Sequence, residues 1–287
     1  MPLPANLTGA LLGLGAFAAF SFYDVMTKVA GAGLPAAQVL FMAGAFSLPA
    51  LWLMARWQGD RGAMRPRHPW IMALRVAVIL TSNVLGVYAF ANLPLATCYA
   101  IFFTMPLIIT LLAWPLLNET IDAWRGTAVA VGFGGVVYAL DPGADTLTTG
   151  HFAAAGAALA SATNFIIIRK VGRAERGFVM QIWPMMGQVA VLAPVMLVMG
   201  QPVDAVQTGA TALMALGMVT GMGLLIAAFA RAPSIVVSPM QYSQILWAAF
   251  YGAMFFDEAL TPRMTLGMAV IIAAGIAILI RPARSAA

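Results

Sequence analysis

Long apolar stretches alternate with short polar or Pro- and Gly-containing breaks along almost the whole chain. Each stretch has about 20 residues, the length that an α-helix needs to cross the hydrocarbon core of a bilayer. The breaks carry turn and helix-start signals such as Gly33-Leu34-Pro35, His68-Pro69 and Asp141-Pro142-Gly143. The pattern predicts an all-α integral membrane protein with ten transmembrane helices, at residues 7–30, 35–57, 69–91, 95–117, 123–140, 150–170, 178–199, 208–230, 233–256 and 263–281.

Composition supports a membrane protein, since 62% of the 287 residues are hydrophobic, 9% are charged and the mean hydropathy is +0.91. The net charge of +5 does not indicate nucleic-acid binding, because we place the basic residues in loops between apolar spans. Cys98 is the single cysteine, so an internal disulfide is excluded. The first residues lack a basic segment, so we expect the first helix to be retained rather than cleaved as a signal peptide.

The basic residues divide unevenly between the two sides that ten spans create. All but two of the 15 Lys and Arg residues fall on the side of the N-terminus, and the exceptions are Lys28 and Arg263. Cytoplasmic loops of membrane proteins carry the excess of Lys and Arg. We therefore predict a multi-pass protein of the bacterial inner membrane with both termini in the cytoplasm.

The two halves of the chain resemble each other at polar and proline positions. The segment Ala89-Phe90-Ala91-Asn92-Leu93-Pro94 recurs as Ala228-Phe229-Ala230-Arg231-Ala232-Pro233, and at the same offset Glu119 corresponds to Glu258. At a slightly larger offset, Lys28 corresponds to Lys170. Shared Leu, Ala and Val would arise by chance in any two apolar helices, whereas shared Pro, Glu and Lys indicate a true repeat.

Five spans in each half have a topological consequence. An odd number of crossings makes the second half enter the membrane from the opposite side. We therefore predict two inverted five-helix repeats, residues 1–145 and 146–287. Inverted repeats are common in secondary transporters, because two similar halves can exchange conformations around a central site.

The repeated stretches resemble the two halves of a drug/metabolite transporter of the EamA type. They are Leu93 to Thr110, Asn118-Glu119 and Gly126 to Tyr138 in the first half, and Pro233 to Glu258 and Gly267 to Leu279 in the second. The resemblance implies a central cavity lined by helices 1–4 and 6–9, and export of amino acids, their relatives or cationic drugs. Within the family the chain is most similar to bacterial aromatic amino-acid and methyl viologen exporters. The family's proline before the Glu is present as Pro106, but Ile245 stands in its place in the second half.

Polar and aromatic side chains inside the spans are the candidate substrate-binding groups. Such groups are costly in lipid, so we expect them to face protein or a water-filled cavity. Aromatic faces beside a few hydrogen-bonding groups suit an amphiphilic organic solute, whereas hydrogen bonds between helices are the alternative role. The predicted substrate-binding residues are Asp24, Asn83, Tyr99, Asn164, Trp183, Gln188, Gln241, Tyr242, Gln244 and Trp247.

Asp24 is the acidic residue that lies clearly inside a span, where a carboxylate costs at least ~2.5 kcal/mol on insertion scales. It is a candidate for binding a cation or a proton, and the alternative is an ion pair with Lys28 one turn later. Because Lys28 has an internal counterpart in Lys170, we predict a gating role for it. We interpret Glu119 and Glu258 as helix-end and loop-ordering residues.

Four prolines interrupt the predicted spans and are candidate hinges: Pro49, Pro106, Pro184 and Pro194. The two histidines, His68 and His151, lie at loops, and the chain has no HExxH, GxSxG or Walker A pattern. We therefore predict no catalytic residue, no metal and no cofactor.

These features together predict a secondary transporter that exports small organic solutes, such as amino acids or related metabolites, by alternating access around a central cavity. A membrane channel or scaffold is the alternative, and an intramembrane enzyme is a weaker one because no nucleophile or metal cluster is found. A channel does not need an inverted repeat. We expect a monomer whose partners are the small-molecule substrate and the lipid bilayer, and not nucleic acid.

Overall fold

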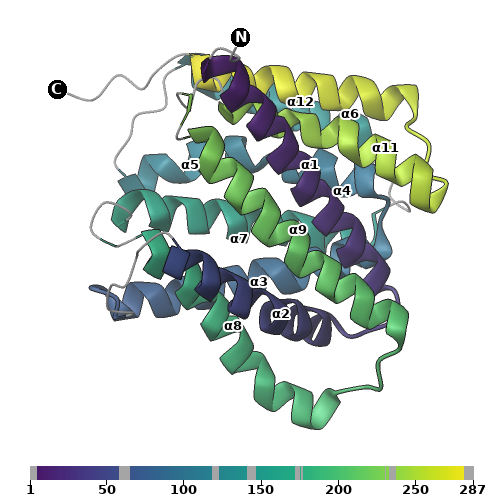
Figure 1. Ribbon diagram of the computed structural model, residues 1–287. Coiled ribbons are helices and arrows are strands. Elements are labelled where there is room, and N and C mark those ends of the chain that lie inside the picture. Colours follow the sequence, from purple (N-terminus) through teal and green to yellow (C-terminus); the bar gives the residue numbers. More distant parts are fainter. Residues whose placement is uncertain are drawn as a thin grey trace.

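The computed structural model describes residues 5–57, 65–117, 123–140, 147–171, 175, 177–229, 231–232 and 237–280. In these residues every regular element is a helix (Figure 1). The helices of the first half are α1 (Ala5–Gly31), α2 (Ala36–Trp57), α3 (Pro69–Asn92), α4 (Leu95–Phe102), α5 (Met105–Leu117) and α6 (Ala123–Leu140). Those of the second half are α7 (Thr149–Val171), α8 (Gly177–Met199), α9 (Ala205–Phe229), η1 (Ser238–Ser243), α11 (Gln244–Phe256) and α12 (Pro262–Ile280).

The helices agree with the predicted spans to within a few residues, which confirms the fold class. Seven segments of the described chain are long and apolar enough to cross a membrane, and one of them, Leu95–Leu116, runs through both α4 and α5. Shorter apolar stretches, Gly126–Ala139 and Pro262–Ala274, lie in α6 and α12. With η1 and α11 taken as one crossing, these segments make the ten spans.

Two spans that we predicted as continuous α-helices depart from α-helical geometry, and they do so at corresponding places of the two halves. In the first half α4 ends at Phe102 and α5 begins at Met105. Proline at position 106 has no amide hydrogen for the carbonyl of Phe102, and the Thr104 hydroxyl donates back to the carbonyl of Ile101 at 2.6 Å. In the second half the 3₁₀ helix η1 precedes α11.

The helix pairings are those of a two-fold repeat. α1 packs along α9, and their counterparts α7 and α3 pack along each other in the same way. α2 packs against its own counterpart α8, and α6 against its counterpart α12. Because each half has five spans, the second half is inverted relative to the first.

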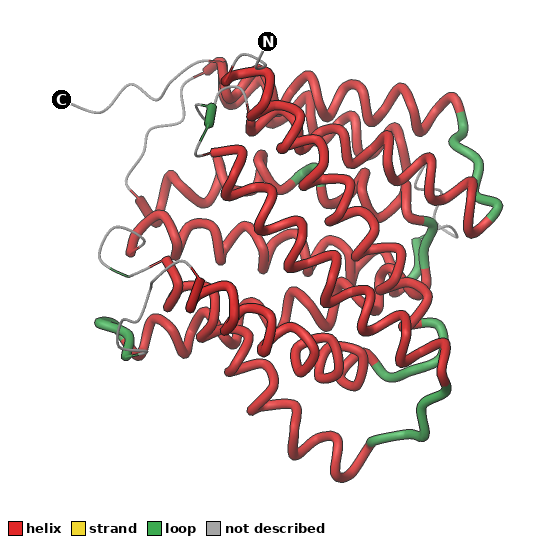
Figure 2. The backbone as a smooth tube through the Cα atoms, in the orientation of Figure 1, coloured by secondary structure: helices red, strands yellow, loops and turns green. Residues whose placement is uncertain are grey.

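The first residues of α1 and the last of α12 lie at the opposite edge of the bundle from three of the described loops. α1 begins and α12 ends at one edge, whereas the loops at 32–35, 200–204 and 257–261 lie at the other edge (Figure 2). We call the edge with these three loops the outer end and the opposite edge the inner end. The two names follow the topology predicted from the Lys and Arg distribution.

Small residues set the closest helix contacts. A Cβ added at Gly267 of α12 would lie 2.8 Å from the carbonyl oxygen of Gly135 and 2.9 Å from Cα of Ala139, so α6 and α12 touch at their backbones. On α9, a Cβ at Gly217 would lie 3.1 Å from the carbonyl oxygen of Ala19 on α1. Small residues allow this approach, as expected for helices in a membrane.

Candidate functional site

A cavity of about 180 Å³ lies between α1, α3, α4 and α7. Its walls come from successive turns of these helices, because residues three and four apart share one helix face. Some wall groups are polar and others are aromatic rings. The lining residues are Tyr23, Asp24 and Thr27 of α1, Ser82, Asn83, Gly86, Val87 and Phe90 of α3, Phe102 of α4, and Ala157 and Ser161 of α7.

Asp24 reaches this cavity and is held by a tyrosine behind it. The hydroxyl of Tyr99 on α4 donates to Oδ2 of Asp24 and also lies 3.2 Å from the Ser21 hydroxyl. Within the described chain, Oδ1 of Asp24 has no hydrogen-bond partner. The Tyr99 ring stacks on Phe103, which in turn packs on Tyr242 of η1, with ring centroids 5.8 Å apart in both pairs. Tyr99 therefore connects the carboxylate to the break in the fourth span and to the 3₁₀ part of the ninth.

Asn83 also lines the cavity, and a chain of hydrogen bonds fixes it. Its amide Nδ2 donates to Oε1 of Gln188 on α8 at 2.8 Å, and Nε2 of Gln188 donates to the carbonyl of Leu40 on α2 at 2.9 Å. Its amide oxygen has no hydrogen-bond partner in the described residues and is an available acceptor in a residue that lines the cavity. Three helices from both halves meet in this network.

Hydroxyl groups that the sequence reasoning missed complete the polar wall. Ser82 on α3 and Ser161 on α7 lie with their hydroxyl oxygens 2.6 Å apart, and Ser82 also donates to the carbonyl of Ala157. Thr27 donates to the carbonyl of Tyr23 within α1. Small hydroxyl residues are common in membrane helices, so the sequence offers only a weak signal for them.

Asn164 supports a buried arginine rather than the cavity. Nε of Arg75 donates to Oδ1 of Asn164 at 3.0 Å, and Nη1 of Arg75 donates to the carbonyl of Met180 at 2.8 Å. Arg75 is buried within α3, and Lys28 lies within α1, so our placement of every basic residue in a loop was wrong for both. The position of Arg75, only six residues after the helix start, made it look like an end residue. Trp183 packs nearby against Met72 and Met180.

The remaining predicted residues lie outside the lining of this cavity. Gln241 and Tyr242 belong to η1, and Gln244 begins α11; all three are half-buried. Trp247 stacks on Tyr251 at 6.3 Å between centroids, and its buried Nε1 has no hydrogen-bond partner in the described residues. Of the ten predicted substrate-binding residues, Asp24 and Asn83 line the cavity, while Tyr99 and Gln188 bond to them directly. Substrate binding by the ten stays a prediction.

The alternative of an Asp24–Lys28 ion pair is wrong in this structure, because Lys28 pairs with Glu258. Nζ of Lys28 also donates to the carbonyl of Leu93 at 2.8 Å, and Oε2 of Glu258 accepts from the amide of Leu95 at 2.8 Å. We call Lys28, Leu93, Leu95 and Glu258 the outer clamp. It joins the end of α1, the start of α4 and the turn after α11, and agrees with the loop-ordering role expected for Glu258.

A second contact holds the outer end. Gln38 near the start of α2 donates from Nε2 to the carbonyl of Gln201 at 2.8 Å, and its Oε1 accepts from the amide of Gln201 at 2.9 Å. Gln201 follows α8, so this pair joins the two halves. The outer end of the bundle is therefore held by two contacts between segments that are distant in sequence.

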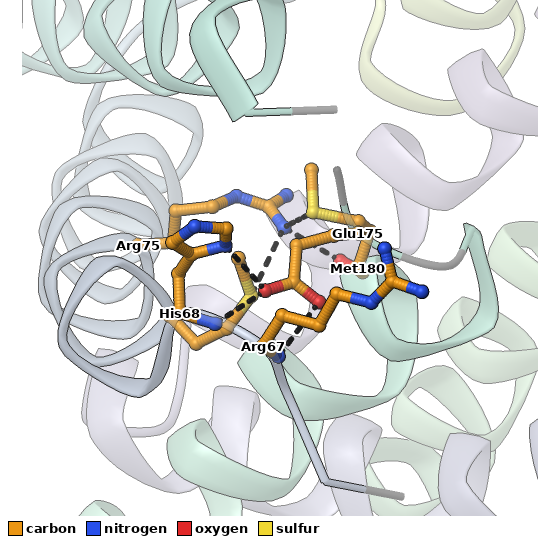
Figure 3. Close-up of polar contacts among 6 residues, drawn as sticks. Arg67, His68, Arg75, Glu175 and Met180 are labelled. Carbon is orange, nitrogen blue, oxygen red and sulfur yellow. Dashed lines mark hydrogen bonds and ion pairs between the residues drawn. The ribbon is translucent and has the colours of Figure 1, made fainter. Parts of the chain in front are cut away.

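A buried carboxylate organises the inner end (Figure 3). Glu175, between α7 and α8, accepts hydrogen bonds from the amides of Arg67 and His68 and lies 3.1 Å from Nδ1 of His68. Burial raises the pKa of Glu175, but the hydrogen bonds and the nearby His68 outweigh it, so the pKa is lowered from its ordinary value. The carboxylate also stabilises the start of α3, where amide groups are otherwise unsatisfied.

The predicted hinge prolines occupy different settings. Pro49 lies inside α2, and Pro184 and Pro194 lie inside α8, without a break in either helix. Pro106 is the second residue of α5, directly after the break in the fourth span. Glu119, the counterpart of Glu258, lies outside the described residues. The hinge roles stay predictions.

Known proteins resemble the chain in sequence and in structure. It is 28% identical to a riboflavin transporter of Rhizobium johnstonii over 95% of this chain and 91% of that protein, and 24% identical to one of Vibrio cholerae over 93% and 91%. It is 26% identical to an S-adenosylmethionine uptake transporter of Rickettsia bellii over 87% and 85%. A solved crystal structure shares the fold with a TM-score of 0.65 and 16% identity over 97% of this chain and 99% of the other.

The sequence pattern of the EamA-like transporter family matches the chain twice, at residues 7–140 and 148–281. The two matches cover the two five-span halves, in agreement with the helix pairings. The family and these relatives are transporters rather than enzymes, and their substrates are small solutes. The chain therefore belongs to the EamA-like transporter family, within the drug/metabolite transporters, and is a multi-pass secondary transporter of small solutes.

Proposed function

We propose that this transporter carries a small organic solute with a cationic group, such as an amino acid or a related metabolite, through the cavity at Asp24. The observation that supports the proposal is the set of free acceptors in the cavity wall. Oδ1 of Asp24 has no partner in the described chain, and the side-chain oxygen of Asn83 is left open by its bond to Gln188. An ammonium or sulfonium group would compensate the carboxylate in this low-dielectric site.

The aromatic walls add a second contribution. The rings of Tyr23, Phe90 and Phe102 line the same cavity, and aromatic faces attract cations that have lost their water. A volume of about 180 Å³ corresponds to roughly six water molecules, which suits a small amino acid or one end of a larger solute. We therefore expect Asp24 to take the charged end of the solute and the rings its apolar part.

The names of the relatives suggest which solutes to test first. S-adenosylmethionine carries both an α-amino acid group and a sulfonium cation, so it falls within the proposed class. Riboflavin is an uncharged flat aromatic molecule, and the aromatic walls favour it as the second candidate. We expected export from the resemblance, whereas one relative is called an uptake transporter, so the direction of transport is part of the test.

The experiment is counterflow in proteoliposomes loaded with one unlabelled solute at a time. The panel is S-adenosylmethionine, phenylalanine, tyrosine, methyl viologen and riboflavin. We expect saturable exchange of at least one cationic or amino-acid solute, and its loss in Asp24→Asn. Asp257→Asn is the matched control, because this exposed carboxylate lies outside the cavity.

Two outcomes would count against the proposal. Saturable exchange of riboflavin alone, unchanged in Asp24→Asn, would favour the second candidate and reject the cationic class. Flux that rises in proportion to concentration, without exchange, would favour the channel alternative.

A further inference from the structure

Lys28 lies between two carboxylates that belong to different parts of the molecule. Outward from it is Glu258, its partner in the outer clamp, and one helical turn inward on α1 is Asp24 in the cavity wall. Side chains four residues apart on a helix are neighbours, so the Lys28 ammonium can reach Asp24 by a change of rotamer. In the described chain its ion pair is with Glu258, and Asp24 is bonded to Tyr99.

The setting of Lys28 makes an unpaired state costly. The Lys28 and Glu258 side chains are only 15% and 17% exposed. Lys28 also lies over the ring of Phe256, with Nζ 4.9 Å from the centroid. If the clamp opens, the largely buried Lys28 cation loses its partner, and the nearest carboxylate on its own helix is Asp24.

The turn that carries Glu258 is itself under strain. Asp257 has φ 53° and is, among the described residues, the one non-glycine residue with positive φ. This left-handed residue ends α11 and directs Glu258 back toward Gly252, whose carbonyl accepts the Glu258 amide at 3.0 Å. A Cβ at Gly252 would lie 3.2 Å from Oε2 of Glu258. Strained turns persist where surrounding contacts hold them, and here the clamp supplies those contacts.

We propose that Lys28 exchanges partners during transport: it pairs with Glu258 when the outer end is closed, and with Asp24 when the outer end is open and the cavity is empty. A cationic solute at Asp24 then displaces Lys28, which returns to Glu258 and closes the outer end. Binding of the solute and closure of the outer end are coupled because the solute and Lys28 compete for the same carboxylate, that of Asp24. The solute's part in this exchange rests on the proposed function above.

A cysteine in the cavity wall reports whether the outer end is open. Gly86 lines the cavity, and a Cβ built there meets no atom within 4 Å, so Gly86→Cys fits without repacking. Cys98, the single cysteine of the chain, is replaced by Ala to give a parent with one thiol. The measurement is the rate of labelling by a membrane-impermeant maleimide in intact cells and in inside-out vesicles. Comparing the two preparations shows from which side of the membrane the thiol is reached, and the rate on that side shows how readily the cavity opens.

Glu258→Gln should raise the labelling rate from the outer side about tenfold, which corresponds to about 1.4 kcal/mol of lost closure. The matched control Asp257→Asn removes a neighbouring carboxylate outside the clamp, and asparagine tolerates the left-handed conformation, so the rate should not change. The charge swap Lys28→Glu with Glu258→Lys should return the rate toward that of the parent. A swap that labels as fast as Glu258→Gln would overturn the ionic clamp.

Asp24→Asn tests the second position of Lys28. Without Asp24, Lys28 stays with Glu258, so labelling from the outer side should fall below the parent rate. Loss of the negative charge of Asp24 would by itself make the introduced thiol more reactive. A slower labelling rate therefore cannot result from a change in thiol reactivity. An unchanged or faster rate would overturn the exchange of partners. None of these rates requires a transported solute, so a negative counterflow result leaves the test intact.

Discussion

Nη1 of Arg75 donates to the carbonyl oxygen of Met180, 2.8 Å away, at a place where α8 has no amide to offer. In an α-helix this carbonyl would accept from residue 184, but residue 184 is proline and has no N–H. The guanidinium therefore occupies a hydrogen-bond position that the proline leaves open. It joins α3 of the first half to α8 of the second half, and Asn164 adds α7.

This relationship predicts a double-mutant cycle. Arg75→Met leaves the carbonyl of Met180 and the amide oxygen of Asn164 buried without donors, so we expect a loss of about 1–3 kcal/mol of unfolding free energy. Adding Pro184→Ala supplies a helical N–H to Met180 and should restore part of that loss. Thermal unfolding of the purified protein in detergent measures both steps.

The control for this cycle is Pro194→Ala, a proline in the same helix that has no arginine opposite its free carbonyl in the described chain. Combined with Arg75→Met it should give no rescue. Equal rescue by the two alanines would show that helix propensity, rather than the Met180 carbonyl, is responsible.

The Glu175 contacts predict a pH-dependent contribution to stability. Because its folded pKa lies below the ordinary value of 4.5, Glu175 stabilises the protein above that pH, and the stabilisation is lost as pH falls through the folded pKa. Glu175→Gln should therefore lower the melting temperature at pH 7, and the difference from the parent should shrink as the pH falls below 4.5. A difference that stays constant with pH would contradict the assignment.

The contact between α6 and α12 predicts opposite effects for two glycine substitutions. Gly267→Ala would place a methyl group 2.8 Å from the carbonyl oxygen of Gly135, so the helices must separate and stability should fall. Gly134→Ala on α6 meets no atom within 4 Å and should be neutral or stabilising by up to about 1 kcal/mol through helix propensity. Melting temperatures of the two variants provide the comparison.

The unequal distribution of Lys and Arg predicts the orientation in the membrane. A cysteine at position 65 should react with an impermeant reagent only from the cytoplasmic side, and one at position 145 only from the outside. Position 145 lies outside the described residues, so the test depends on sequence alone there. The reverse labelling pattern would invert the topology, although the fold would stay the same.

The amino-acid sequence by itself determined the number, order and ends of the spans. The bilayer fixes how long an apolar run must be, and Pro and Gly mark where each run ends, so α3 at Pro69–Asn92 follows from local pattern alone. Repeated Pro, Glu and Lys positions also determined the inverted repeat. The cavity residues Asp24 and Asn83 were found because polar groups are rare and costly inside a span.

The tertiary structure decided which polar groups meet. Local spacing offered Asp24 as the partner of Lys28, but Glu258 pairs with Lys28 because α1 and the turn after α11 come together at the outer end. Arg75 likewise bonds residues that lie far from it in the chain. The hydrophobic effect determines which segments lie in the membrane, and each segment shows this in its own sequence. Which polar side chains form hydrogen bonds or ion pairs depends on how the helices pack against one another, and no single segment determines that packing.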